Sequence, residues 1–344
     1  MSDDRLPVQV ATAPSVADGD EIGRLHRLFL WLNSGCNSRC KMCDIWREPK
    51  GTHISAAAIA RWAPEWRSLS VPSVIICGEP LLHPQLWQIV DAICAHGISV
   101  ELLSNGYLVP RHARNIVDSC VVLRISLDGP ADVHNEVRGV TRAFALVARA
   151  TAAIHRLSPS FPIDARCAVH RLNFRCLGAT VDSARDLGFR SISFSGTDLH
   201  NEEAFRRHGM LDNAYVSSLA IAGDELDELE RELCRLRTDH AEDFACGFIS
   251  DSPADLDRLL LDYYRALAGE GSFPTVRCNA PWTSAVVEYD GGIRPCFPLP
   301  TYGNVTDCGG FAAVINSDDA VGFRRALDVN TNTACQRCVC QTLS

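Results

Sequence analysis

Residues 28–43 read Leu28-Phe-Leu-Trp-Leu-Asn-Ser-Gly-Cys36-Asn-Ser-Arg-Cys40-Lys-Met-Cys43. The apolar run at 28–32 predicts a buried strand, and the cysteines after it are spaced Cys-x3-Cys-x2-Cys. Three thiolates on one short loop can hold three irons of a cubic 4Fe–4S cluster, which leaves the fourth iron open to another ligand. An open metal position supports chemistry, whereas a closed site serves structure or electron transfer.

Two plainer interpretations compete with a cluster at these cysteines. In the first, the three cysteines belong to a zinc site in which His53 is the nearest candidate for the fourth ligand. In the second, they are a chance grouping in a chain of 16 cysteines. The Cys-x2-Cys pairs that are typical of zinc ribbons are not the pattern here. Motifs further along the chain favour the cluster.

The cysteine loop resembles the signature of the radical SAM superfamily. In that family the open iron binds S-adenosylmethionine (SAM), and reductive cleavage of SAM gives a 5′-deoxyadenosyl radical that takes a hydrogen atom from the substrate. The resemblance implies that Cys36, Cys40 and Cys43 bind a catalytic 4Fe–4S cluster, and that Met42 packs near the adenine of SAM. It also implies an electron donor such as flavodoxin or ferredoxin.

Predicted strands and helices alternate after this loop. The strands are expected at 28–32, 73–77, 98–104, 121–127, 162–170 and 190–195, with helices at 55–66, 85–96, 110–119, 143–157 and 173–187. Six apolar strands joined by helices predict an α/β fold with a parallel sheet, open or closed into a barrel. The family resemblance implies a partial (β/α)6 TIM-like barrel, in which function lies at the carboxyl ends of the strands.

The second predicted strand ends in Cys77-Gly78-Glu79-Pro80, which resembles the Gly-Gly-Glu-Pro motif of the family. In that motif the backbone and the glutamate help to hold the SAM ammonium group. A carboxylate suits a cation, and glycine permits close approach of the backbone. Cys77 replaces the first glycine, and we expect it to be an inert buried thiol.

The fourth predicted strand ends in Ser126-Leu-Asp128-Gly129, which resembles the Ser-x-Asp-Gly motif of the same family. The resemblance implies that the hydroxyl of Ser126 and the carboxylate of Asp128 bind the ribose hydroxyls or the carboxylate side of SAM.

Alternation along the strands predicts which side chains face the interior of the barrel. One face of the fifth strand carries Asp164, Arg166, Ala168 and His170, and the opposite face is apolar. Because polar groups do not fit under packed helices, we expect this polar face, with Glu101 and Arg124, to look inward. One arginine would clamp the SAM carboxylate and the other an anionic substrate, unless structural ion pairs occupy them. Glu101 or His170 would accept a proton.

A second group of cysteines lies near the end of the chain: Cys278, Cys296, Cys335, Cys338 and Cys340. A turn at 290–292 between apolar runs predicts a β-hairpin that brings Cys278 near Cys296. The Cys335-x2-Cys338 pair then completes a closed site that suits either zinc or an iron–sulfur cluster.

Gly291-x4-Cys296, followed by Cys-x2-Cys, resembles the SPASM or shorter twitch extension of radical SAM enzymes. The resemblance implies an auxiliary 4Fe–4S cluster on Cys278, Cys296, Cys335 and Cys338. Because the chain stops at Ser344, we expect one twitch-like cluster, with Cys340 and Cys308 as spare thiols. The expected domains are a flexible segment at 1–23, a barrel with trailing helices at 24–272 and a cluster domain at 273–344.

Composition indicates a cytoplasmic enzyme. Lys and Arg number 33 against 42 Asp and Glu, a net charge of −9 without a long basic run, which argues against nucleic acid as a partner. No apolar signal segment or membrane-spanning stretch is predicted. Sixteen cysteines without a secretion signal imply a reducing compartment, where thiols serve as metal ligands or stay buried.

Two classes of radical SAM enzyme share this layout. One class acts on small molecules, as in cytosylglucuronate decarboxylase and the twitch-type sugar alcohol dehydrogenases, and the other matures ribosomal peptides. Because Cys36 leaves little room for an N-terminal leader-binding domain, we expect a small anionic sugar or nucleoside substrate, decarboxylated or dehydrogenated in antibiotic biosynthesis. A peptide maturase is the alternative, and an iron–sulfur electron carrier without enzymatic activity is a further one.

Overall fold

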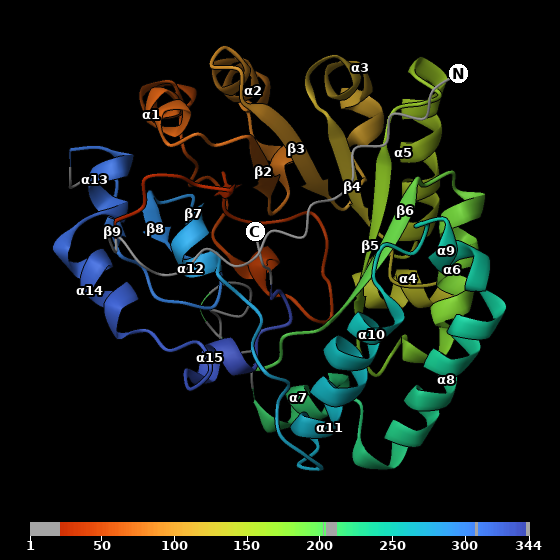
Figure 1. Cartoon of the computed structure of the whole chain (residues 1–344). Coiled ribbons are helices and arrows are strands. Elements are labelled where there is room, and N and C mark those ends of the chain that lie inside the picture. The colour runs from red at the N-terminus through yellow and green to blue at the C-terminus, as the bar shows by residue number, and fades with distance from the viewer. Residues whose placement is uncertain (1–20, 202, 204–211, 307–308, 342–344) are drawn as a thin grey trace, which may run out of the picture.

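The computed structural model describes residues 21–201, 203, 212–306 and 309–341, and a nine-stranded sheet organises them. The strand order is β6-β5-β4-β3-β2-β1-β7-β8-β9. Most of the predicted N-terminal segment 1–23, and the spare thiol Cys308, lie outside the described residues. Figure 1 shows the sheet as a curved wall, with helices along its outer side and the C-terminal elements at one end.

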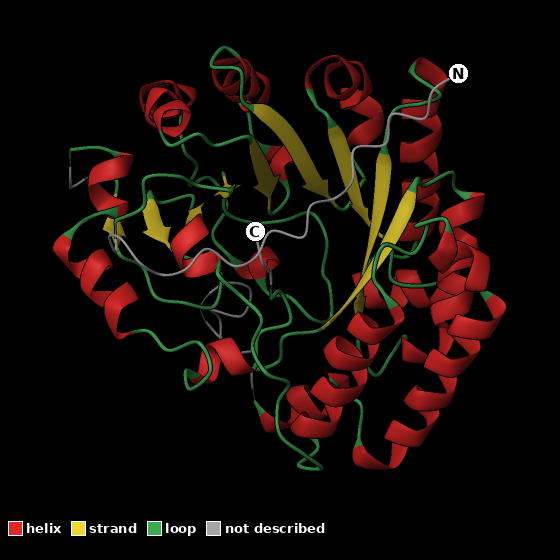
Figure 2. Ribbon diagram, in the orientation of Figure 1, coloured by secondary structure: helices red, strands yellow, loops and turns green. Residues whose placement is uncertain are grey.

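Six parallel strands form the barrel part of the sheet. They are β1 (Arg27–Trp31), β2 (Ser73–Cys77), β3 (Ser99–Ser104), β4 (Val122–Ser126), β5 (Ile163–Val169) and β6 (Ser191–Gly196). Each lies within two residues of its predicted bounds, and they pair in chain order. The predicted α/β partial barrel is therefore confirmed (Figure 2).

Helices cover the outer face of these strands: α1 (Ala56–Ser68), α2 (Leu86–Cys94), α3 (Val109–Ser119), α5 (Ala143–Leu157) and α6 (Leu177–Asp186). The face of β5 that carries Ile163, Ala165 and Cys167 is buried in this core, as alternation predicts. A short 3-10 turn, Phe174–Cys176, opens the segment predicted to be helical from residue 173.

Between β4 and α5, the helix α4 (Ala131–Arg138) was not predicted. It starts after Pro130, whose fixed backbone angle suits a helix entrance, and it ends at Gly139 in the left-handed conformation, with φ +61°. Its sequence is mostly polar and lacks an apolar helical pattern, because only His134, Val137 and Arg138 are buried. This helix carries the main support of the cysteine loop.

The C-terminal strands extend the same sheet. β7 (Ser284–Val287) runs parallel to β1, and β8 (Gly292–Arg294) returns antiparallel to it, which confirms the predicted hairpin. β9 (Gly303–Asn304) adds the last strand. The sheet thus continues across the expected boundary at residues 272–273.

The remaining helices pack around the carboxyl half of the chain. They are α7 (Asn213–Leu219), α8 (Leu226–Asp239), α9 (Ala241–Ala245), α10 (Pro253–Leu256), a π-helical segment (Asp257–Asp262), α11 (Tyr263–Leu267), α12 (Ala280–Thr283), α13 (Phe311–Ile315), α14 (Asp318–Ala326) and α15 (Thr333–Gln336). Among the described residues, no helix has the length and apolar composition needed to cross a membrane.

The free edge of β6 is capped by the segment before α10. The Ile192 amide donates to the Phe248 carbonyl at 2.7 Å, and the Phe194 amide donates to the carboxylate of Asp251 at 2.7 Å. Burial raises the pKa of Asp251 to about 6, while the hydrogen bond from the Phe194 amide opposes that rise. A capped edge is protected against pairing with another strand.

Candidate functional site

The three cysteines of the first loop lie at the carboxyl end of β1. Cys40 is buried, whereas Cys36 and Cys43 are half-buried and both pack beside Trp31, Ile45 and Cys77. The Cys36 sulfur accepts from the Ser38 amide at 3.4 Å and from Asn105 Nδ2 at 3.7 Å. Burial, with Glu79 nearby, raises the pKa of the Cys36 thiol to about 12.

This donor set fits a 4Fe–4S cluster, because three thiols and two hydrogen-bond donors to sulfur share one short loop and its neighbour. Among the residues that the structure describes, no three Cys, His, Asp or Glu side chains converge on one point as ligands of a single metal ion. A cubic cluster has its thiolates on separate irons and does not require such convergence.

The cysteine loop is docked on the C-terminal end of α4. The Arg39 and Lys41 amides donate to the Arg138 and Val137 carbonyls at 3.1 and 2.9 Å. The Ser38 hydroxyl donates to the Arg138 carbonyl at 3.0 Å. These bonds satisfy carbonyls that a helix end leaves without intrahelical partners, so the helix and the loop fix each other.

The motif after β2 closes over the same loop. Gly78 has φ +81°, and a Cβ on it would meet the Trp31 ring at 2.8 Å. Glu79 is fully buried and accepts from the Ser104 hydroxyl at 2.9 Å and from the Asn105 amide at 2.8 Å. Burial raises the pKa of Glu79 to about 7, although these hydrogen bonds oppose the rise.

Asn105, which follows β3, is a residue of the site that was not predicted from the sequence. Its Nδ2 reaches both Asn37 Oδ1, at 2.6 Å, and the Cys36 sulfur, and its amide holds Glu79. The Asn-Gly pair after β3 was the available signal, because a turn at the carboxyl end of a barrel strand lies at the functional end.

The expected buried thiol at Cys77 is present. Its sulfur donates to the Leu30 carbonyl at 3.5 Å, and burial raises the pKa of the thiol to about 12. Met42, expected near the adenine of SAM, is buried in the main core beside the loop cysteines.

The motif after β4 places its two polar groups differently. Ser126 is half-buried at the end of the strand, and its hydroxyl makes no hydrogen bond to another described residue. Asp128 is fully buried: one oxygen accepts from the Ala168 amide at 3.1 Å, and the other lies 2.5 Å from Arg138 Nε. Arg138 in turn donates to the Cys40 sulfur at 3.6 Å.

His170 follows β5 and has no exposed surface. Its Nδ1 accepts from the Leu172 amide at 3.2 Å, and burial lowers the pKa of the imidazole to about 4, so the ring is neutral. The structure does not bring His170 to the surface of the lumen with Arg166; it lies near Asp128 inside the wall.

The other polar residues of the lumen form a ladder of ion pairs across the strands. Arg124 Nη2 lies 2.7 Å from Glu101 and its Nη1 lies 4.0 Å from Asp164, which Arg190 also contacts at 2.7 Å. Glu101 and Arg124 therefore form structural ion pairs, the alternative to a role in binding, because each charge is compensated by its neighbour.

Arg166 lies closer to the carboxyl ends of the strands than this ladder. Its guanidinium donates to the Ser195 hydroxyl at 3.5 Å and to the Cys340 sulfur at 3.7 Å. In the part of the chain that the structure describes, no carboxylate lies within ion-pair distance of it. Arg166 is exposed, and it connects the barrel wall to the C-terminal cysteines.

Those C-terminal cysteines gather from three segments. Cys278, Cys296 and Cys335 pack in one small apolar cluster with Val276 and Leu299. Burial raises the pKa of the Cys335 thiol to about 11, with Cys278 contributing, and the pKa of the Cys296 thiol rises for the same reasons. Cys338 and Cys340 interact electrostatically with each other and with Cys296 or Cys278. This all-sulfur set fits an iron–sulfur cluster.

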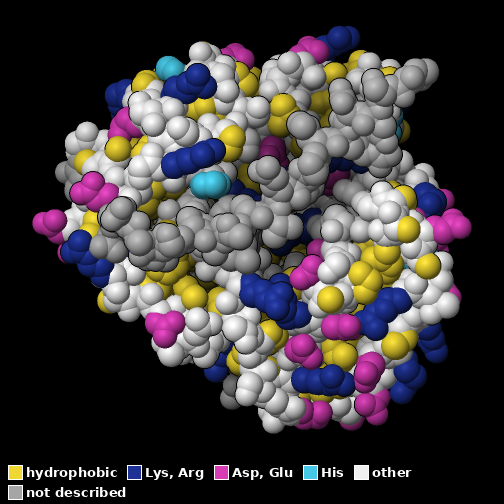
Figure 3. Space-filling model, viewed as in Figure 1, with side chains coloured by type: hydrophobic (Ala, Val, Ile, Leu, Met, Phe, Trp, Pro, Cys, Tyr) yellow, Lys and Arg dark blue, Asp and Glu magenta, His cyan; other side chains and the backbone are white. Residues whose placement is uncertain are grey.

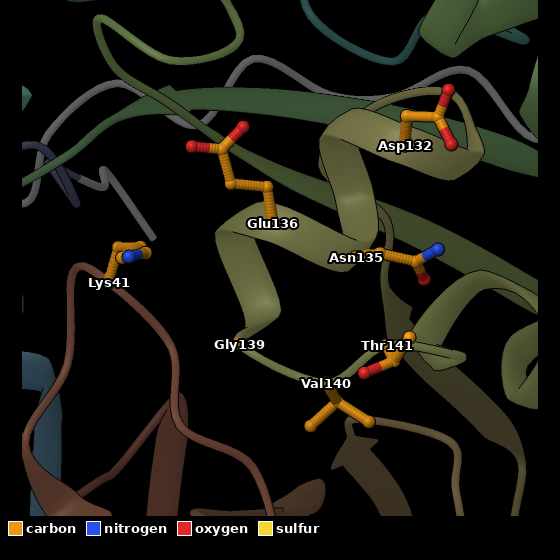
Figure 4. A pocket seen from close by; sticks show the side chains of 7 residues that line it. All are labelled: Lys41, Asp132, Asn135, Glu136, Gly139, Val140 and Thr141. Carbon is orange, nitrogen blue, oxygen red and sulfur yellow. The ribbon is translucent and has the colours of Figure 1, made fainter.

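An open pocket of about 490 Å³ lies beside the loop (Figure 4). It is lined by Lys41, Asp132, Asn135, Glu136, Gly139, Val140 and Thr141. No cysteine lines it, so it is not the cluster site.

On the face seen in Figure 3, basic and acidic side chains are interspersed.

Two sequence families match the chain. Residues 32–184 match the Radical SAM superfamily, and residues 278–339 match SPASM, an iron–sulfur cluster-binding domain. The two matches imply a 4Fe–4S cluster with SAM in the barrel and auxiliary iron–sulfur binding at the C-terminal cysteines. The matches therefore favour iron–sulfur clusters over zinc at both groups of cysteines.

Three curated proteins are similar to parts of the chain. AdoMet-dependent heme synthase of Methanosarcina barkeri is 29% identical over 47% of this chain and 48% of its own length. Mycofactocin maturase MftC of Mycobacterium ulcerans is 40% identical over 21% of this chain and 20% of its own. The antilisterial bacteriocin subtilosin biosynthesis protein AlbA of Bacillus subtilis is 26% identical over 80% of this chain and 55% of its own length. The chain thus spans about half, or less, of these relatives.

Two solved structures have the same fold. The enzyme anSMEcpe with bound AdoMet and the Cp18Cys peptide aligns with a TM-score of 0.63 at 17% identity, covering 91% of this chain and 87% of that one. SuiB of Streptococcus suis with S-adenosylmethionine aligns with a TM-score of 0.61 at 13% identity, covering 94% and 74%.

Proposed function

Because this chain carries a radical SAM domain and a C-terminal SPASM domain, we propose that it is a radical SAM enzyme that modifies a peptide. The observation that carries the proposal is the similarity to AlbA, which extends over 80% of the chain. The similarity to the maturase MftC supports the same substrate class. Peptide substrates thus take the place of the sugar- or nucleoside-like metabolite that the sequence led us to expect.

The residues of the loop and its neighbours have distinct tasks in this proposal. Cys36, Cys40 and Cys43 hold the catalytic cluster, which together with SAM supplies a 5′-deoxyadenosyl radical. Gly78 lets the backbone pack against the Trp31 ring, and Ser126 offers a hydroxyl without another described partner. Glu79 and Asp128 support the site from inside the wall, since neither has exposed surface.

The C-terminal site holds one auxiliary cluster on Cys278, Cys296, Cys335 and Cys338. Cys340 stays outside this set, because the SPASM match ends at residue 339. A closed cluster has no open iron, so its task is electron transfer or support of the fold. A small donor such as flavodoxin or ferredoxin would supply the electrons.

Arg166 is the residue that we propose to contact the substrate. Its side chain is exposed and donates to the Cys340 sulfur, and no described carboxylate lies within ion-pair distance of it. A guanidinium in that position suits a carboxylate, either an acidic side chain or the end of a peptide. Arg166→Gln should raise KM for an acidic substrate and leave SAM binding unchanged, as expected when a substrate contact is lost.

The experiment is anaerobic reconstitution with iron and sulfide, followed by dithionite, SAM and synthetic peptides encoded by short reading frames beside the gene. We expect 5′-deoxyadenosine together with a mass change in one peptide by mass spectrometry. The variant Cys43→Ala, which should lack the catalytic cluster, is the control. If 5′-deoxyadenosine forms but no peptide changes mass, the peptide proposal is wrong and radical SAM chemistry remains.

A small anionic metabolite is the second candidate. The similarity to a heme synthase over 173 residues, confined to about half of this chain, favours it together with Arg166. Product analysis after incubation with metabolite extracts distinguishes it from the peptide proposal, because only a small molecule would then change mass. If neither class of substrate is altered and 5′-deoxyadenosine does not form, the electron-carrier alternative takes its place.

A further inference from the structure

The catalytic cysteine loop has a buried cation beside it. Arg138 is the last residue of α4, is 9% exposed, and donates from Nη1 to the Cys40 sulfur at 3.6 Å. Its own carbonyl accepts from the Arg39 amide and the Ser38 hydroxyl. Backbone and side chain of one residue therefore hold the loop from the same side.

The guanidinium is itself held in place by Asp128. Its Nε lies 2.5 Å from one oxygen of that fully buried carboxylate, and the Ala168 amide of β5 fixes the other oxygen at 3.1 Å. Although burial by itself lowers the pKa of Arg138, the charge of Asp128 and the neighbouring Cys40 raise it above its ordinary range. The group is therefore cationic at any working pH.

The two histidines beside this ion pair carry no charge. His134 and His170 also lie close to Asp128, and burial lowers the pKa of each imidazole to about 4, so both are neutral. The His134 Nδ1 accepts from the Asp128 amide at 3.0 Å, which holds that backbone in place. The pair of Asp128 and Arg138 is thus an ionic contact that reaches the loop from the barrel wall.

We propose that Arg138 is a positioning residue for the catalytic cluster, whose hydrogen bond to the Cys40 sulfur raises the reduction potential of that cluster. The inference rests on the proposed assignment of Cys40 as a ligand. Reduction adds one negative charge to the cluster, and a buried cation within hydrogen-bond distance of a ligating sulfur stabilises the more negative state. Asp128 keeps the guanidinium aimed at the sulfur and prevents it from turning to solvent.

The test is a redox titration of reconstituted enzyme, followed by electron paramagnetic resonance. The SAM-binding cluster is identified by the change in its signal when SAM is added, which separates it from the auxiliary cluster. Arg138→Gln should lower the midpoint potential of this cluster and leave that of the auxiliary cluster unchanged. Arg175→Gln, which removes an equal charge from a surface pair with Glu225 and Glu228, should change neither.

Arg138→Lys keeps the charge but loses the fork that reaches both Asp128 and Cys40, so its potential should fall between those of the wild type and Arg138→Gln. If Arg138→Gln fails to hold iron, the test uses Arg138→Lys instead. A midpoint potential of the SAM-binding cluster in Arg138→Lys equal to that of the wild type would overturn the proposal. An unchanged potential in an iron-loaded Arg138→Gln overturns it as well. If the iron-loaded Arg138→Gln variant has an unchanged midpoint potential but binds SAM more weakly, the proposal is also overturned, because Arg138 would then be a SAM ligand. These titrations need no substrate, so their failure leaves the peptide proposal untouched.

Discussion

Gly139 is the residue at which α4 and the cysteine loop meet most closely. A Cβ there would clash with the Arg39 carbonyl, and φ +61° is a conformation that favours glycine. Gly139→Ala should therefore displace the loop, and iron analysis should show loss of the catalytic iron with the auxiliary iron kept. Gly322→Ala in α14, where nothing lies within 4 Å of the added Cβ, is the matched control and should keep both. Full iron content in Gly139→Ala would mean that the contact does not hold the loop.

Glu79 makes stability depend on pH. Burial raises its pKa to about 7 in the folded protein, against about 4.5 in the unfolded chain, so the folded state retains a proton that unfolding releases. Stability from this group is therefore lost as pH rises from about 4.5 to about 7, on the order of 3 kcal/mol. Glu79→Gln removes the titration, so wild type should lose stability relative to this variant between about pH 4.5 and about pH 7. Urea unfolding measures the difference, and a constant difference contradicts the prediction.

At the scale of elements, the loop after β1 and the segment around α15 should hold separate clusters. Replacing Cys36, Cys40 and Cys43 with Ala should abolish SAM cleavage and leave roughly half of the iron, since the auxiliary site remains. Replacing Cys335 and Cys338 should remove the other half, and Cys340→Ser should keep it. Iron analysis with measurement of 5′-deoxyadenosine tests each variant. Zinc at the C-terminal site after anaerobic purification, with no iron lost on mutation, would contradict the assignment.

At the scale of the whole molecule, the two matched domains share one sheet. β7 pairs with β1 from Arg27 opposite Ser284 to Leu30 opposite Val287, so removing the C-terminal part leaves the first barrel strand with an open edge. A chain that ends at residue 272 should therefore be insoluble or lack a cooperative unfolding transition. Thermal unfolding of the two chains compares them directly. A soluble, iron-loaded chain 1–272 would show instead that the barrel folds independently.

The alternation of apolar strands and helices was sufficient to predict the barrel. Period-two patterns in residues 163–169 also predicted which face enters the core, because a polar side chain cannot be buried under helices without a partner. Motif spacing predicted both groups of cysteines and the hairpin between Cys278 and Cys296, since short loops and tight turns are local features. Substrate class lies beyond such local patterns, and similarity to relatives is what favours the proposed peptide over a small metabolite.

Only the tertiary structure decided the partners of the charged residues. Resemblance assigned Asp128 to SAM and alternation placed Arg124 in the lumen, but Asp128 is buried against Arg138, ten residues further along the chain, and Arg124 pairs with Glu101 on the neighbouring strand. It also revealed α4, whose polar sequence gives little sign of a helix. The sequence by itself determined the strands, the turns and the cysteine spacings, because backbone preference and periodicity act over a few residues. Ion pairs form between residues that only chain folding brings together, so their partners depended on the three-dimensional arrangement.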